Sequence, residues 1–139
     1  MRYMIILKND LTSGAQMPSR QIFTDMSNYN RALSEAGVLR ALEGLSNSDH
    51  DAQITSVKGK QKVTDGPFAE AKELVGGFWI IEVKSKAEAL DWARRMPSME
   101  GASIEVRRVA EVSDFNGVMP HEIIAQEEKI RQNLASQRT

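Results

Sequence analysis

Length, composition and charge describe an ordinary globular domain and exclude several classes of function. The chain has 139 residues, of which 41% are hydrophobic and 27% charged, a balance typical of one soluble domain. A formal net charge of −1 gives no basic field for nucleic acid, and the absence of cysteine excludes disulfides, thiolate metal sites and a cysteine nucleophile. The apolar run from Met4 to Leu7 is too short for a signal peptide or a membrane span. We therefore expect a cytoplasmic protein that binds neither nucleic acid nor membranes.

The first third of the chain predicts a strand, a helix and another strand. Tyr3 to Leu7 is apolar and rich in β-forming residues, which indicates a buried strand. A helix is expected from Ser19 to Ala36 and should end at Gly37, because glycine readily takes the left-handed conformation of a C-terminal cap. Val38 to Leu45 predicts a second strand, and the polar run 46–51 predicts the loop after it. The helix is supported by apolar residues at steps of three and four: Ile22, Phe23, Met26, Tyr29 and Leu33.

The middle of the chain predicts an antiparallel hairpin and then the most apolar strand. Ala52 to Val57 is strand-like, Lys58-Gly59-Lys60 is a turn signal, and Gln61 to Thr64 should return antiparallel. An Asp-Gly-Pro turn and a short charged helical turn are expected next. The pair Gly76-Gly77 is then expected to bend the chain into the strand Phe78 to Val83.

The last part of the domain predicts a short helix and a final strand. Ser85 and Glu88 have the spacing of a capping box, and Pro97 follows the expected end of this helix. Ser103 to Val109 alternates imperfectly and suggests a strand with one buried face. With one strand before the first helix and a hairpin added, this order predicts an α+β, ferredoxin-like βαββαβ subunit, with two helices on one face of a mostly antiparallel sheet.

The C-terminal part, 110–139, behaves as an extension of the domain at 1–109. Pro120 can start a helix, and Ile123, Ile130 and Leu134 would form a narrow apolar stripe along it. Isolated helices of about 12 to 15 residues are marginal in water, so this helix should dock on the same subunit or on a second one.

The turn at Asp65, Gly66, Pro67 and Phe68 is the principal candidate for a site. A structural interpretation has Asp65 accepting backbone hydrogen bonds, Gly66 and Pro67 shaping the chain, and Phe68 filling the core. A functional interpretation has Asp65 acting as a general base in a cleft that it shares with the ammonium group of Lys72. The sequence leaves both open, with Gly66, Pro67, Phe68 and Lys72 as ligand-binding candidates.

Glu43 is a second candidate for a catalytic carboxylate, since it falls inside an apolar strand beside Gly44. Strand alternation would equally well direct it to solvent. His50 and His121, the two histidines, lie in different segments without a second histidine at ligand spacing. We therefore expect no metal site and no cofactor.

Several segments together resemble the DGPF-domain proteins of the YCII-related group. They are Tyr3-Met4, Ala36 to Leu39, Glu43 to Leu45, Thr64 to Lys72, Gly76 to Phe78 and Glu88 to Ala93, in one order over about residues 1–109. The resemblance implies a ferredoxin-like subunit of the dimeric α/β-barrel class, in which a homodimer forms by face-to-face association of two sheets. Apolar residues on both faces of the strand Phe78 to Val83 agree with this arrangement.

The resemblance implies less about function. Smaller YCII-related proteins are regarded as enzyme-like because a histidine on the first helix faces an aspartate, whereas Ser19 to Ala36 contains no histidine. Three hypotheses remain. The first is a homodimeric small-ligand-binding protein with its pocket near the Asp-Gly-Pro-Phe turn. The others are a proton-transfer isomerase or lyase using Asp65 and Glu43, and an accessory protein in extracytoplasmic-function sigma factor signalling, which the family resemblance alone suggests.

Overall fold

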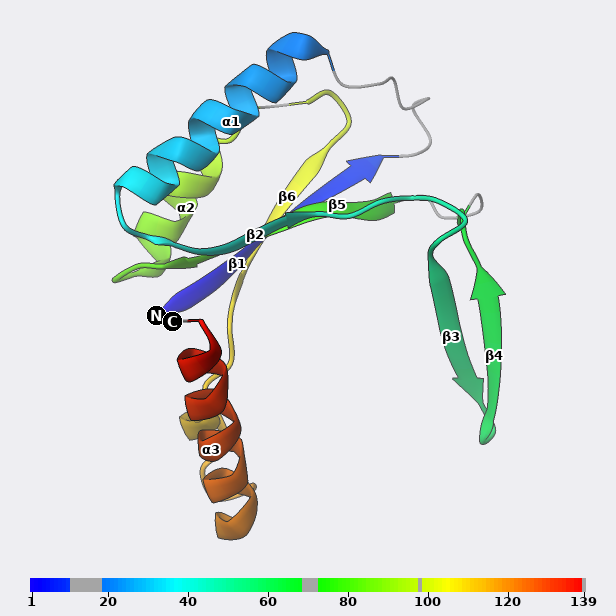
Figure 1. Ribbon diagram of the computed structural model, residues 1–139, viewed down its shortest axis with the longest axis vertical. Coiled ribbons are helices and arrows are strands. Elements are labelled where there is room, and N and C mark those ends of the chain that lie inside the picture. The colour runs from blue at the N-terminus through cyan, green and yellow to red at the C-terminus, as the bar shows by residue number, and fades with distance from the viewer. Residues whose placement is uncertain (11–18, 69–72, 98, 139) are drawn as a thin grey trace. The chain divides into compact units, whose positions relative to one another are not determined.

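The computed structural model describes residues 1–10, 19–68, 73–97 and 99–138, and Figure 1 shows their helices and strands. The chain divides into two compact units, Met1–Arg108 and Val109–Thr139, which are described separately. The elements in chain order are β1 (Arg2–Asp10), α1 (Arg20–Glu35), β2 (Leu39–Gly44), β3 (Ala52–Val57), β4 (Lys60–Asp65), β5 (Glu73–Glu82), α2 (Lys86–Arg94), β6 (Ser103–Arg108), the 3₁₀ helix η1 (Val112–Phe115) and α3 (His121–Gln137).

The first unit contains a four-stranded antiparallel sheet in the order β2-β5-β1-β6. Helices α1 and α2 lie on the same face of it (Figure 1). This order, with one helix between β1 and β2 and another between β5 and β6, is the ferredoxin-like plan. The predicted α+β class, the added hairpin and the C-terminal helix are therefore confirmed.

The core lies between this sheet and its two helices. Successive strand residues point to opposite faces, so Tyr3, Ile5 and Leu7 of β1 all face the helices and are at most 8% exposed. Trp79 and Ile81 of β5 are buried on the same face, as their pairing with Ile5 and Tyr3 requires. The helices bury Tyr29 and Leu33 from α1 and Ala89, Trp92 and Ala93 from α2, and Met96 packs beside them.

Tyr29 joins three elements of this core. Its hydroxyl donates a hydrogen bond to the carbonyl oxygen of Trp92 at 2.8 Å, which connects α1 to α2. Its ring meets that of Trp79 edge to face, with the centroids 6.2 Å apart. The indole N–H of Trp79 donates to Asn30 Oδ1 at 2.8 Å, so β5 is fixed to α1 by a polar contact as well.

Both helix boundaries of α1 follow the predicted chemistry. The hydroxyl of Ser19 accepts a hydrogen bond from the backbone N–H of Ile22 and caps the start. At the end Gly37 has φ of 73°, and the amides of Gly37 and Val38 donate to the carbonyls of Ser34 and Leu33. These two bonds form a Schellman motif, in which glycine takes the left-handed conformation without steric cost.

The capping box predicted for α2 is only partly formed. Ser85 Oγ accepts from the amide of Glu88, as expected. The carboxylate of Glu88, however, accepts from the amide of Lys84 at 2.9 Å, one residue before the cap. The exposed N–H that the glutamate satisfies is therefore that of the residue preceding Ser85.

The predicted bend at Gly76-Gly77 is wrong, because both glycines lie inside β5. Gly76 is the extra residue of a bulge, since Leu7 pairs with Gly77 and Lys8 with Val75. A Cβ on Gly76 would collide with Asn9 Nδ2, and one on Gly77 would lie 3.0 Å from the carbonyl oxygen of Glu43. The Asn9 side chain could move aside for a larger residue at Gly76, whereas the Glu43 backbone leaves little room for one at Gly77.

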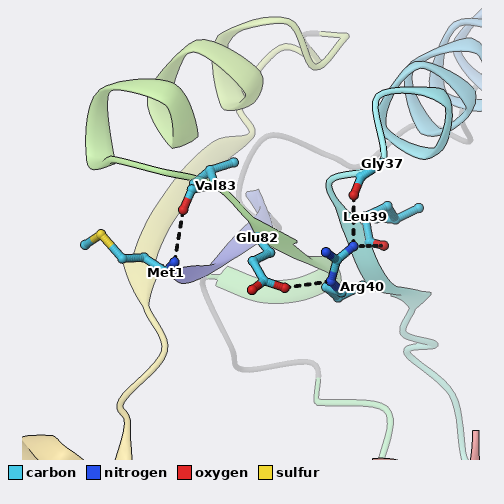
Figure 2. A network of polar contacts seen from close by, with 6 residues as sticks. All are labelled: Met1, Gly37, Leu39, Arg40, Glu82 and Val83. Atoms are coloured by element: carbon cyan, nitrogen blue, oxygen red, sulfur yellow. Dashed lines mark hydrogen bonds and ion pairs between the residues drawn. The ribbon is translucent and has the colours of Figure 1, made fainter.

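A second bulge, at Arg40 of β2, organises the other end of the sheet. Figure 2 shows the Arg40 guanidinium between Glu82 and the exit of α1. It contacts the Glu82 carboxylate at 2.8 Å and donates to the carbonyls of Gly37 at 2.9 Å and Leu39 at 3.2 Å. Close by, the amino group of Met1 donates to the carbonyl of Val83 at 3.0 Å (Figure 2). Polar contacts thus hold the C-terminal end of β5 from both sides.

The sheet face opposite α1 and α2 is apolar in its middle and charged on β6. Met4, Ile6, Phe78 and Ile80 alternate with the core residues and are half-buried. Towards β6, the ammonium of Lys8 lies 2.8 Å from a carboxylate oxygen of Glu105 and 3.9 Å from one of Glu73. We call the face opposite α1 and α2 the open face of the sheet.

Strands β3 and β4 pair with each other in a separate two-stranded sheet (Figure 1). Every residue of both strands is exposed, including Ile54, Val57 and Val63 at 62% or more. The hairpin predicted around Lys58 and Gly59 is confirmed, and both residues have the positive φ of a two-residue type I′ turn.

The second unit consists of η1 and α3. The predicted helix after Pro120 is confirmed, and its stripe residues Ile123, Ile130 and Leu134 are 39 to 52% exposed. Within the described residues, no helix combines the length and apolar character needed to cross a membrane.

The Tyr29 hydroxyl gives the first prediction. Tyr29→Phe should lower the free energy of unfolding by about 1 kcal/mol at neutral pH, the net value of one hydrogen bond. Burial also raises the pKa of Tyr29 to about 12, from the ordinary value of 10.0. Its contribution is therefore complete below pH 10 and is lost as the pH rises towards 12. Urea unfolding at several alkaline pH values should show that the free energy of unfolding falls less steeply with pH in Tyr29→Phe than in the unmodified protein. Equal slopes for the two proteins would contradict this prediction.

The Lys8–Glu105 pair gives an acid-limb prediction. A hydrogen bond from Lys8, with its charge, holds the pKa of Glu105 below its ordinary value. This contribution is present above the ordinary glutamate pKa and is lost as the pH falls through the lowered one. Urea unfolding of Glu105→Gln at low salt should lack that part of the acid decline. Glu100→Gln, at an exposed position, is the control and should show the full acid decline of the unmodified protein. If Glu105→Gln also showed the full decline, the Lys8–Glu105 pair would have no effect on stability.

Candidate functional site

A hollow of ≈ 590 Å³ lies where β2 and β5 reach the loop before the hairpin. Its described lining consists of Gly44, Leu45, Ser46, Asp51, Phe68, Leu74 and Val75. Four of these side chains are apolar and one is charged. Another hollow, ≈ 420 Å³, lies on the hairpin around Lys58, Lys60 and Lys62, but all of its lining residues are exposed. The first hollow has three half-buried lining residues, Asp51, Phe68 and Leu74, and is therefore the better candidate.

Asp51 organises the loop that forms one wall of the hollow. Its Oδ1 accepts from the hydroxyl of Ser46 at 2.9 Å, and its Oδ2 accepts from the amide of Ser48 at 2.8 Å. The backbone N–H of Asp51 donates to the Ser48 carbonyl at 3.1 Å, which closes the turn. Because the side chain is half-buried and bonded on both oxygens, its carboxylate has a defined position.

The Asp-Gly-Pro-Phe turn lies directly against this loop. The amide of Gly66 donates to the carbonyl of Asp51 at 2.7 Å, and the amide of Phe68 donates to Asn47 Oδ1 at 3.4 Å. A Cβ on Gly66 would collide with the carbonyl oxygen of Ser48, so only glycine fits there. The Gly66-Pro67 peptide bond is cis. The turn thereby brings Phe68 to the hollow, half-buried, rather than into the helix-covered core.

The two predicted catalytic carboxylates, Asp65 and Glu43, do not line the hollow. Asp65 is the last residue of β4 and is exposed, and within the described residues no hydrogen bond to its side chain is found. The side chains that accept backbone hydrogen bonds at this corner are instead Asp51, from the Ser48 amide, and Asn47, from the Phe68 amide. Glu43 is also exposed and lies on the open face opposite Phe78. Lys72 lies outside the described residues, as does the charged helical turn expected around it.

Of the predicted ligand-binding residues in the described part of the chain, Phe68 lines the hollow. Gly66 is bonded to the Asp51 loop but does not line the hollow, and Pro67 is exposed. The sequence analysis missed Asp51 and Ser46, which it assigned only to a polar loop. Ser48 and Asp51 have the Ser-x-x-Asp spacing of a capping box, in which the acidic side chain accepts from the amide three residues before it, and this is the signal that could have identified Asp51. Over the described part of the chain, no group of three His, Cys, Asp or Glu side chains is arranged to hold a metal ion.

Two comparisons relate this chain to known proteins. A sequence model of the YCII-related domain matches residues 1–113. An uncharacterised protein of Rhizobium meliloti (strain 1021) is 35% identical over 115 residues, which are 79% of this chain and 93% of that protein. With four fifths of its length aligned to this relative and its whole sheet inside the matched domain, the chain belongs to the YCII-related family.

Proposed function

We propose that this YCII-related protein is a homodimeric small-ligand-binding protein, with the hollow beside the Asp-Gly-Pro-Phe turn as its ligand site. The observation that carries the proposal is the combination of apolar walls with one fixed carboxylate, Asp51. Small-molecule sites typically enclose about 300 to 1,000 Å³ and pair apolar lining with a few placed polar groups. A hollow of ≈ 590 Å³ falls within that range.

The homodimer is supported by the open face of the sheet. Met4, Ile6, Phe78 and Ile80 form an apolar centre on that face, and all four are only half-buried. Burying apolar surface yields roughly 25 cal/mol per Å², so a second sheet placed there would gain substantially. Val75, 40% exposed and on this face beside Lys8, extends the apolar surface towards the hollow.

Ligand binding ranks above proton-transfer catalysis because a general base works best where water is excluded and its acidity is tuned. Asp65 and Glu43, which the enzyme alternative requires, are both exposed. The signalling alternative has one supporting observation, the exposed stripe of Ile123, Ile130 and Leu134 on α3. Such a stripe could bind many kinds of partner and does not specify a sigma factor. The signalling function is therefore the second candidate.

The dimer is tested by Ile6→Lys. Its cross-strand neighbour is Glu105, so the new ammonium has a counter-charge and the subunit should fold. Two copies of the charge would meet at the proposed interface, which should shift the molar mass by light scattering from dimer to monomer. Val118→Lys, at a position 85% exposed, is the control and should remain dimeric. A dimeric Ile6→Lys protein would refute an interface on the open face.

The ligand site is tested by Gly44→Val. A Cβ on Gly44 meets nothing closer than the Gly76 carbonyl at 4.0 Å, so valine should fill part of the hollow without disturbing β2. Fragments from a library of small aromatic compounds should shift the amide NMR signals of Leu45, Phe68 and Val75. In Gly44→Val they should bind about tenfold more weakly, which corresponds to about 1.4 kcal/mol. Ser56→Val, in the exposed β3, is the control; equal weakening in both variants, or none, would oppose the proposal.

A further inference from the structure

We propose that the hollow selects small organic cations, with the Asp51 carboxylate accepting the ligand's hydrogen bond and an apolar ligand body against Phe68 and Leu74. The inference rests on the proposed ligand site and adds the chemical class of its ligand. It follows from which hydrogen-bonding groups around the hollow are already engaged and which remain available.

Three of the donors around the hollow are engaged within the protein. The amide of Leu45 donates to the Gly76 carbonyl at 2.9 Å, and that of Phe68 donates to Asn47 Oδ1 at 3.4 Å. The hydroxyl of Ser46 has one hydrogen, and it is donated to Asp51 at 2.9 Å. These three groups therefore offer no hydrogen to an anionic ligand.

Acceptors remain available. An ionised carboxylate offers about four lone-pair sites on its two oxygens, and the protein occupies one on each oxygen of Asp51. The Ser46 oxygen, having donated its hydrogen, can still accept. An ammonium or guanidinium group placed beside them would form charge-assisted hydrogen bonds, which are roughly twice as strong as neutral ones.

The charge of the lining favours the same ligand class. Asp51 is the single charged residue among the described lining residues, and it is half-buried. Opposite charges attract more strongly near partly buried groups than in bulk water, and an anion would be repelled by the same carboxylate. The four apolar side chains, Leu45, Phe68, Leu74 and Val75, would contact a hydrocarbon body of the ligand.

The experiment compares three probes that share a phenyl ring and differ in charge: phenethylammonium, 2-phenylethanol and phenylacetate. Binding to the full chain is followed by NMR titration of the Leu45 and Phe68 amides. The cation should bind about tenfold tighter than the alcohol, as expected for a charge-assisted bond, and phenylacetate should bind weakest. The advantage of the cation should shrink as salt is raised, because exposed charges are screened.

Asp51→Asn is the decisive variant. The asparagine oxygen can still accept from the Ser48 amide and its NH₂ can donate to Ser46, so the loop should keep its fold. Phenethylammonium should then bind no tighter than 2-phenylethanol. Asp49→Asn, exposed in the same loop, is the matched control and should retain the cation's advantage. If Asp51→Asn unfolds, the salt dependence in the unmodified protein decides in its place.

Failure of this inference differs from failure of the ligand site. If the neutral or anionic probe binds at least as well as the cation, and Gly44→Val weakens it, the site stands and the cation inference falls. A preference for phenylacetate that is lost in Lys72→Gln would assign the selectivity to Lys72. If none of the probes shifts the amides, and the fragment library also binds without regard to Gly44→Val, the ligand site itself is refuted.

Discussion

The rest of the structure depends on β5 being hydrogen-bonded along both of its edges. It pairs with β1 over most of its length and with β2 over its C-terminal part, and it carries Trp79 and Ile81 into the core. Gly76 and Gly77 of β5 are crowded from the two sides, by the Asn9 side chain and by the Glu43 backbone carbonyl. The two bulges adjust the sheet locally, and the paired strands hold the hollow's inner wall in a fixed position.

The constraint also explains why the candidate site lies where it does. Leu74 and Val75 begin β5, and Gly44 ends β2, so the ends of two adjacent paired strands define one side of the hollow. Asp51 and Phe68 come from the loops flanking the hairpin and form the other side. A rigid sheet therefore faces loops held by a few side-chain hydrogen bonds, an arrangement in which loops commonly carry function on a fixed scaffold.

Local patterns predicted most of the fold because they are set by short-range chemistry. The apolar period of α1, its Ser19 cap and its Gly37 end each depend on neighbours a few residues away. Gly76-Gly77 could not be interpreted correctly because the groups that crowd these glycines belong to β1 and β2. For the same reason Asp51 was overlooked and Asp65 was favoured, since only the folded chain shows that the Ser46 hydroxyl meets the Asp51 carboxylate and that the Gly66 amide meets the Asp51 backbone carbonyl.

The hairpin has a different relation to the domain. Strands β3 and β4 pair only with each other, and none of their side chains enters the core. Folding of the central sheet therefore places few demands on the hairpin's length or composition, since long surface insertions cost little entropy to close. A change in the length or composition of this arm would leave in place the hydrogen bond from the Gly66 amide to the Asp51 carbonyl, at the edge of the hollow. The arm is thus a region where new specificity can evolve without rebuilding the domain.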